Sequence, residues 1–300
     1  MARANYIPEL AITEPGSVVT DLRAYTTIAL AIADISTTPS TLLISRDETV
    51  AAGTTTIPST TTVMFTRGSV LTVPTGAALV VNGNIDAPLN QIFNRTGTGT
   101  ITLRKGALTR VYPQYFGALG DGSNDDTTAI EDAVATVIVR GGTVWFPTGT
   151  YLITSSIVID TDTNQVPVVL RGEEPGTAGT DSGSLIEGSF AGYLVDFHST
   201  GSIGLRCGVR DLGFSGTAQA LTQHGVRIGY VRQGFVENCA FQYFDNGIAV
   251  GVTGGGTGMA AGTYIKKVNF LDTNICINLI NFIETTASDI QGSIHGNVPT

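Results

Sequence analysis

The sequence predicts an all-β solenoid, a fold in which short strands stack coil upon coil. Composition, recurring short apolar segments and one apolar pattern that returns at a near-constant distance support this prediction. Threonine and glycine together make 80 of the 300 residues, and they combine strand-favouring β-branched residues with turn formers. The chain is 42% apolar and only 14% charged, which allows a sizeable core and excludes a wholly disordered chain.

Short apolar segments recur between turn residues from residue 41 onward. Examples are residues 63–65, 70–73 and 78–81, which are separated by Gly68 and by the turn at residues 74–76. The same alternation continues from residue 143 to residue 280. Segments of this length, bounded by such residues, are typical of strands.

One pattern, V/I-x-x-φ-x-F, occurs at residues 209–214, 236–241 and 265–270, so its copies follow one another at nearly equal intervals. A coil of this length cannot bury its apolar face alone, so it stacks on its neighbours. A β-sandwich would also contain short strands, but it would not explain the longer register. We therefore prefer the solenoid.

A helix is predicted over residues 125–137, because apolar residues 130, 133, 134 and 137 follow the helical period. Asp125 or Asp126 can cap its first turn, and Gly141 and Gly142 end it. A second helix is predicted over residues 20–35, starting at Asp21 and ending before residues 36–40. The alternation of residues 28, 30 and 32 is also compatible with a strand.

Charge and cysteine usage exclude several classes of function. The net charge of −9 leaves no basic patch for nucleic acid. Cys207, Cys239 and Cys276 show neither CxxC nor Cys/His spacing, so we expect buried thiols rather than disulfides or a zinc site. We expect no metal and no cofactor.

Both ends of the sequence lead to expectations. The start has no apolar signal-peptide core, and the apolar run at residues 28–33 is too short to span a bilayer. We therefore expect synthesis in a cytoplasm and no membrane insertion. Residues 289–300 resemble one more coil. Since a solenoid needs a cap at each end, we expect that Thr300 is not the native end or that another chain covers this coil.

A longer motif, F-G-A-x-G-D-G-x-x-D-D-T-x-A followed by G-G-x-V-x-F-P-x-G-x-Y, occupies residues 116–129 and 141–151. It resembles the entrance to the pectate-lyase-like right-handed parallel β-helix of bacteriophage tailspikes and of polysaccharide lyases and hydrolases. Glycines 117, 120 and 122 suit sharp turns with positive φ. In this interpretation the helix caps the open end of the β-helix and protects its first coil from edge pairing. The motif residues are Phe116, Gly117, Ala118, Gly120, Asp121, Gly122, Asp125, Asp126, Thr127, Gly142, Phe146, Pro147, Gly149 and Tyr151.

Residues 83–93 and 111–118 resemble the head of such spikes. The resemblance implies an N-terminal tail-docking arm at residues 1–20, a head region with a short helix and β coils at 21–110, and the β-helix at 111–300, with a possible truncation at the C-terminus. It also implies a homotrimer in the virion that docks on phage tail or adaptor proteins through its N-terminus. The implied ligand is a bacterial surface glycan.

The resemblance implies a tailspike or tail-fibre protein that recognises bacterial surface polysaccharide and, in one version, degrades it. The first alternative is a free polysaccharide lyase or glycoside hydrolase. The second is a non-enzymatic adaptor that carries another receptor-binding protein. Whether the chain is an enzyme stays open at this stage.

Glu237, Asp245 and Asp272 are the candidate catalytic residues. Glycoside hydrolysis needs two carboxyl groups roughly 5 to 10 Å apart, and these acids fall in neighbouring predicted coils. Tyr243, Phe244 and Tyr264 lie nearby and are candidates for stacking on sugar rings. The simpler interpretation is that the three acids are solvated charges at strand ends.

A lyase would need a base and a cation to neutralise the substrate carboxylate. Lys266, Lys267, Arg227 and Arg232 are available, but the sequence shows no particular arrangement of them. Residues 223–229, Q-H-G-V-R-I-G, only faintly resemble the G-H-G and R-I-K segments of the hydrolases, and N-T-D is absent downstream. Catalytic residues are therefore not transferred.

The remaining polar motifs have structural interpretations. We expect Asp121, Asp125 and Asp126 to form a turn and a helix cap rather than a metal site. His198, His224 and His295 are expected in turns or on the surface, and residues 251–262 in a loop. A further group, Tyr112, Tyr115 and Phe116, is expected to pack at the junction between head and β-helix.

Overall fold

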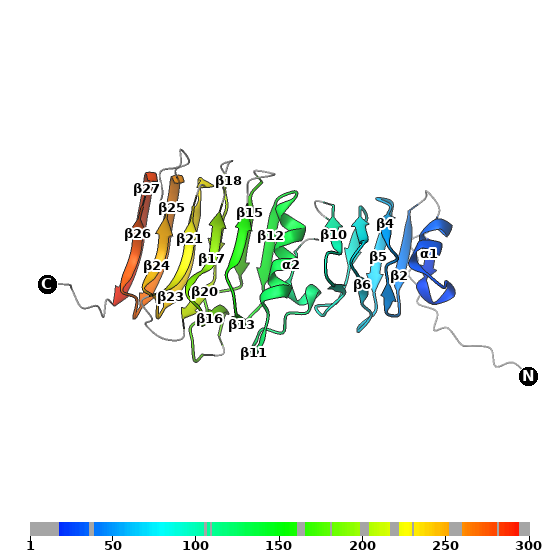
Figure 1. Cartoon of the computed structure of the whole chain (residues 1–300), viewed down its shortest axis with the longest axis horizontal. Helices are drawn as coiled ribbons and strands as arrows, with labels where there is room; N and C mark the ends of the chain where they lie inside the picture. The colour runs from blue at the N-terminus through cyan, green and yellow to red at the C-terminus, as the bar shows by residue number, and fades with distance from the viewer. Residues whose placement is uncertain are drawn as a thin grey trace, which may run out of the picture.

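The computed structural model describes residues 18–35, 39–104, 107–108, 110–160, 166–180, 182–198, 204–216, 222–229, 231–251, 260–280 and 282–293. The chain is mostly β, with few helices, and the named strands pair in parallel. The strands lie one behind another along the long axis of the molecule, from β1 at one end to β27 at the other (Figure 1). The predicted predominance of short strands is therefore confirmed.

Two stacks of strands follow one another along this axis. The first stack has three sheets, and each of the three coils that follow β1 gives one strand to each sheet. Register partners in neighbouring coils, such as Leu42 with Val63 and Val63 with Ile85, follow one another at nearly equal intervals. Its sheets comprise β1 (Val18–Asp21), β2 (Ser40–Ile44), β5 (Thr61–Phe65) and β8 (Asn84–Asp86); β3 (Glu48–Thr49), β6 (Leu71–Val73) and β9 (Phe93–Arg95); and β4 (Gly53–Ile57), β7 (Ala77–Val81) and β10 (Thr100–Leu103).

The second stack has a large sheet and a smaller one. The large sheet comprises β11 (Asp121–Asp125), β12 (Gly142–Phe146), β13 (Gly149–Ile153), β15 (Val168–Gly172), β16 (Ser184–Gly188), β18 (Gly204–Leu205), β19 (Gly208–Arg210), β20 (Gly213–Gly216), β22 (Val231–Arg232), β23 (Phe235–Gln242), β25 (Ala260–Leu271) and β27 (Phe282–Ser293). The smaller sheet comprises β14 (Ile157–Asp160), β17 (Gly192–His198), β21 (Gln223–Ile228), β24 (Asn246–Val250) and β26 (Ile275–Leu279).

Single residues with positive φ bend the coils of the second stack. Asp211, Asn238, Lys267 and Asp289 have φ values of 56°, 51°, 54° and 55°, and the pairing on either side aligns them in consecutive coils. Positive φ is uncommon outside glycine. Its recurrence at one register position identifies a corner that turns the chain within one residue.

The repeated V/I-x-x-φ-x-F pattern is confirmed as a structural repeat. Its first residues pair as Val209 with Val236 and Val236 with Ile265. Its phenylalanines, Phe214, Phe241 and Phe270, are also register partners. Their rings stack with centroids 5.0 and 5.4 Å apart and are at most 3% exposed. The repeat therefore builds a column of aromatic rings inside the second stack.

Helix α2 (Thr127–Ile138) confirms the first predicted helix. Its amphipathic face contacts β12, β14 and the short helix η2 (Pro113–Phe116), and it also contacts β10. The helix lies between the two stacks (Figure 1). The helix packs on β12 and β14 at the beginning of the second stack, as expected, but this end is not open, because the first stack continues on the other side of the helix (Figure 1). Arg95 of the first stack donates to Asp132 of α2 at 2.5 Å.

The second predicted helix forms only in part. Residues 20–35 contain the end of β1, the 3₁₀ helix η1 (Leu22–Ala24) and α1 (Ile28–Asp34). Asp21 accepts from the Arg23 amide at 2.9 Å and thereby starts η1, and Thr27 accepts from the Leu30 amide to start α1. The first part is extended because β1 pairs with β2.

The glycine and aspartate motif has the predicted structural role. Gly117, Gly120 and Gly122 have φ values of 104°, 63° and 71°. Asp125 accepts from the Thr127 amide at 3.0 Å and so caps α2. Asp126 instead accepts from two amides of the preceding loop, Leu119 at 2.7 Å and Gly120 at 3.0 Å. Burial raises the pKa of the Asp126 carboxyl.

Of the aromatic residues predicted to pack at the junction, Tyr115 and Phe116 are buried and Tyr112 is half-buried. Tyr115 and Phe116 are 6% and 7% exposed, and the ring centre of Phe116 lies 5.7 Å from that of Phe93 in the first stack. Tyr151 is fully buried, and its hydroxyl accepts from Gln114 and donates to the Pro147 carbonyl.

The three cysteines are free, and Cys207 and Cys239 are buried, as expected. Cys276 is half-buried. Among the described residues, no helix is long and apolar enough to cross a membrane, and no three metal-ligating side chains gather. Most of the predicted arm (1–17), most of the loop at 251–262, His295 and residues 294–300 lie outside the described residues. The three domain boundaries stay predictions.

Candidate functional site

A cluster of polar side chains lies on the outward side of the smaller sheet. It consists of Tyr193 and Asp196 from β17, His224 and Arg227 from β21, and Asp245 and Asn246 at the start of β24, and it is called the lateral network below. Parallel pairing places Tyr193 beside His224 and His224 beside Asn246. The same register places Asp196 beside Arg227. Residues far apart in sequence thus meet in consecutive coils.

Arg227 and Asp196 form one half of the lateral network. Arg227 Nε donates to Asp196 Oδ1 at 2.6 Å, and a terminal nitrogen donates to Asp196 Oδ2. The guanidinium also lies 4.9 Å from the centre of the Tyr193 ring. This two-pronged pairing raises the pKa of Arg227. Asp196 is 8% exposed, so the arginine provides the compensating charge that a buried carboxylate requires.

His224 occupies the centre of the network. Its ring centre lies 4.8 Å from that of Tyr193, and its Nδ1 accepts from the Asn246 amide nitrogen at 3.1 Å. Since an amide nitrogen can only donate, the neutral imidazole carries its proton on Nε2. Asp245 Oδ2 lies 3.9 Å from Nδ1 and accepts from Asn246 at 3.1 Å. Burial lowers the pKa of His224, and the charge of Asp245 opposes this shift.

The lateral network combines donors and acceptors that suit a hydroxylated ligand. Burial raises the pKa of Tyr193, so its phenol remains protonated at neutral pH. The lowered pKa of His224 leaves a neutral imidazole there. A neutral imidazole beside a carboxylate can also transfer protons. The network therefore has the chemistry for binding sugar hydroxyls and the groups that acid–base catalysis requires.

The three candidate acids do not form one site. Asp245 lies in the lateral network. Asp272 lies in the following coil, at a corner where it pairs in register with Tyr243, and both have positive φ. Glu237 instead lies on the large sheet and is ion-paired with Arg210 at 2.6 Å. Five residues, 238–242, separate Glu237 from Tyr243, and the chain turns at Asn238 between them. Their catalytic roles stay predictions.

Two of the three aromatic residues suggested for sugar stacking, Phe244 and Tyr264, pack on other aromatic rings of the protein. Phe244 is fully buried against Phe241, so its interpretation as a sugar platform is wrong. Tyr264 is half-buried and stacks on Phe235 at 5.7 Å. Tyr243 is half-buried at its corner. The basic residues Lys266, Lys267 and Arg232 are exposed.

Sequence reasoning missed Tyr193 and treated His224 as an isolated turn or surface residue. The only signal was the faint hydrolase resemblance of residues 223–229, which contains both His224 and Arg227. The coil that leads from Tyr193 to His224 is longer than the coil that leads from His224 to Asn246. Such unequal coil lengths hide the register, so only the structure brings these side chains together.

Comparisons with known proteins support part of the resemblance. Residues 114–182 match the family model "Rhamnogalacturonase A/epimerase, pectate lyase-like". This segment is therefore similar to pectate lyase-like proteins. It contains the glycine and aspartate motif, α2 and the first coils of the second stack.

Two further similarities are partial. Plasmin and fibronectin-binding protein A of Streptococcus pneumoniae (strain ATCC BAA-255 / R6) is 40% identical over 63 residues, which is 19% of this chain and 9% of that protein. The solved structure of ORF18 of Geobacillus virus E2 is 18% identical, with a TM-score of 0.39, and the match covers 63% of this chain and 39% of that one. The chain thus spans a minor part of both proteins.

Proposed function

We propose that this protein is a phage tailspike or tail-fibre subunit that recognises a bacterial surface polysaccharide. In this proposal both stacks are right-handed parallel β-helices, the chain assembles as a homotrimer, and its N-terminal residues dock on the phage tail. The protein resides in the virion. The polysaccharide lies along the side of the second stack, across the lateral network.

The lateral network is the observation that carries the glycan-binding proposal. It presents a half-buried phenol, imidazole, guanidinium and carboxylate from consecutive coils, so a chain of hydroxylated rings can contact several of them at once. The buried Asn246 holds the His224 ring in place. The pectate lyase-like match at residues 114–182 supports a polysaccharide as the ligand class. The phage assignment rests on the tailspike resemblance of residues 83–93 and 111–151.

Cleavage of the bound glycan is a second candidate function, favoured by the 3.9 Å approach of Asp245 to His224. A carboxylate and an imidazole in this arrangement can serve as acid and base. Binding without cleavage would leave the attachment function intact.

The test uses purified capsular and lipopolysaccharide glycans from a panel of bacteria and the full chain. Binding is measured by biolayer interferometry, and new chain ends are measured by mass spectrometry. We expect binding to at least one polysaccharide, with a Kd raised at least tenfold by the conservative change His224→Gln together with Asn246→Ala. Wild-type protein that binds none of the panel, or a variant that binds equally well, would contradict the proposal. Unsaturated product ends would identify a lyase, and saturated ends a hydrolase.

A further inference from the structure

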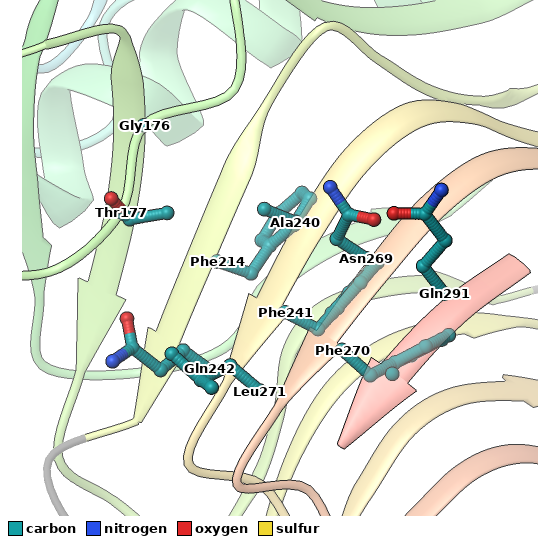
Figure 2. A pocket seen from close by; sticks show the side chains of 11 residues that line it. Gly176, Thr177, Phe214, Ala240, Phe241, Gln242, Asn269, Phe270, Leu271 and Gln291 are labelled. Carbon is teal, nitrogen blue, oxygen red and sulfur yellow. The ribbon is translucent and has the colours of Figure 1, made fainter.

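A groove of about 310 Å³ lies on the outward side of the large sheet, one corner away from the lateral network. Its walls are the segment around Gly176 and Thr177 on one side and strands β23, β25 and β27 on the other. Figure 2 shows Thr177 and Gln242 on one side of this space and Asn269 and Gln291 on the other. None of the eleven residues that line it carries a charge.

Two amide side chains form the polar side of the groove. Asn269 of β25 and Gln291 of β27 are register partners in neighbouring coils, and both are exposed. Their amide groups lie side by side (Figure 2). Within the described part of the chain neither amide has a hydrogen-bond partner. Neighbouring parallel strands are about 4.8 Å apart, so two donor and acceptor pairs face the groove at that spacing.

The opposite wall is held in place by the fold. The carbonyl of Gly176 lies so close to Gly213 of β20 that a Cβ there would come within 1.8 Å of it. Gly213 therefore allows the segment to rest directly on the sheet. Gln242 Oε1 accepts from the Ala178 amide at 3.2 Å and ties the segment to β23. The groove is thus formed before any ligand arrives, which reduces the entropic cost of binding.

The remaining lining is apolar. Leu271 is 44% exposed and is the register partner of Gln242, and Ala240 adds a second aliphatic surface. A pyranose ring presents hydroxyl groups at its rim and C–H groups on its faces, so amides and an aliphatic surface match both parts. A charged sugar would lose hydration without gaining an ionic partner in this groove.

We propose that this groove binds one uncharged pyranose residue of the glycan, as a subsite adjoining the lateral network. The proposal rests on the proposed function, since it names the sugar class of part of that ligand. Gln242 lies immediately before the corner residue Tyr243, and Asp245 lies just beyond it. One glycan chain can therefore cross the corner and place an uncharged residue in the groove and its neighbour on the network.

The direct test uses methyl glycosides of glucose, galactose, mannose, rhamnose and N-acetylglucosamine as probes, with methyl glucuronide as the charged comparison. Saturation-transfer NMR detects binding to the full chain. We expect a signal from at least one uncharged glycoside and none from the glucuronide. Replacing both amides, Asn269→Ala with Gln291→Ala, should weaken binding about tenfold, as expected for the loss of about 1.4 kcal/mol.

A matched control and a second variant keep this test decisive. Asn94→Ala changes a half-buried asparagine on β9 of the first stack and should leave the signal unchanged. Ala240→Trp should abolish it by filling the groove while both amides remain. An unchanged signal in the double variant, no signal from any uncharged glycoside, or an equal loss with Asn94→Ala would overturn the proposal.

The proposed function can be distinguished from this subsite. If the wild-type chain binds a bacterial polysaccharide and the groove variants bind it with the same Kd, the subsite is wrong and polysaccharide recognition stands. If no polysaccharide binds, both are wrong.

Discussion

The two stacks differ in the residues that turn their coils: the second stack uses residues other than glycine in addition to glycines, and this difference separates a plain stack from one that carries sites. In the first stack the positive-φ positions are glycines, such as Gly53, Gly68 and Gly76. In the second stack eight residues other than glycine adopt positive φ, among the described residues: Arg206, Asp211, Gln233, Asn238, Tyr243, Lys267, Asp272 and Asp289. Each such residue is disfavoured in this conformation, yet each places a side chain at a corner.

Coil length also differs between the two stacks. The first stack has short coils of nearly equal length, in which Thr41 pairs with Thr62 and residue 62 with residue 84. Most coils of the second stack are longer and their lengths vary, and the longest connect register partners such as Leu170 and Val209. Longer coils carry excursions such as the segment around Gly176, which walls the groove. The comparison indicates that the first stack extends the molecule, whereas the second combines extension with ligand binding.

The largest expected effect tests whether the two stacks unfold independently of each other. Phe241→Ala removes the middle ring of the Phe214–Phe241–Phe270 column and should cost about 3–5 kcal/mol. Amide hydrogen exchange should speed up across β19 to β26 and stay unchanged in β2 to β7. The control, Phe65→Ala, removes a 7% exposed ring that packs edge-on against Phe93 and should have the reverse pattern. Equal loss of protection in both stacks would show that they unfold as one unit.

The next largest effect concerns the ion pair between Arg227 and Asp196. Arg227→Lys keeps the charge but loses the two-pronged contact with Asp196, so we expect the free energy of unfolding to fall by about 1–3 kcal/mol. The Arg46→Lys change in the first stack should cost less, because Arg46 is 34% exposed and Arg227 only 23%. Urea titration of both variants checks this order. A larger loss for Arg46→Lys would contradict the expectation that the less exposed arginine contributes more to stability.

Substitutions at corner residues of the two stacks should change the free energy of unfolding in opposite directions. Gly68 has a φ of 84° with open space where a Cβ would lie, so Gly68→Ala adds only backbone strain, about 1 kcal/mol. Lys267→Gly removes such strain from an exposed corner and should stabilise the chain by about a few tenths of a kcal/mol, after the entropic cost of glycine. Thermal unfolding measures both. Destabilisation by Lys267→Gly of more than that of Gly68→Ala would show that the lysine side chain itself supports the corner.

Part of the fold of both stacks could be predicted from the sequence, and part could not. The V/I-x-x-φ-x-F repeat predicted the stacked coils and the apolar period predicted α2, because both patterns are local. Strands β4 and β11 were missed. Gly53–Ile57 is rich in threonine and Asp121–Asp125 is entirely exposed, so cross-strand pairing rather than apolar content makes them strands. Phe244 was misjudged because the positive φ of Tyr243 interrupts the alternation of sides.

The smallest expected effect is the pH dependence that His224 gives the second stack. Burial lowers its folded-state pKa below the unfolded value of about 6.5, with Asp245, Tyr193 and Arg227 facing the ring. Its stabilising contribution is therefore complete above pH 6.5 and is lost as the pH falls through the folded-state pKa. His224→Gln should flatten the stability profile in this window. An unchanged profile would mean that other groups dominate the acid response.

The most direct test of the central claim is hydrogen exchange of the full chain with and without a bacterial surface polysaccharide that it binds. The account predicts slower exchange in β17, β21, β24 and the groove strands β23 and β25, and no change in β2 to β10. Slower exchange confined to the first stack would contradict it, as would failure of every polysaccharide in the panel to bind.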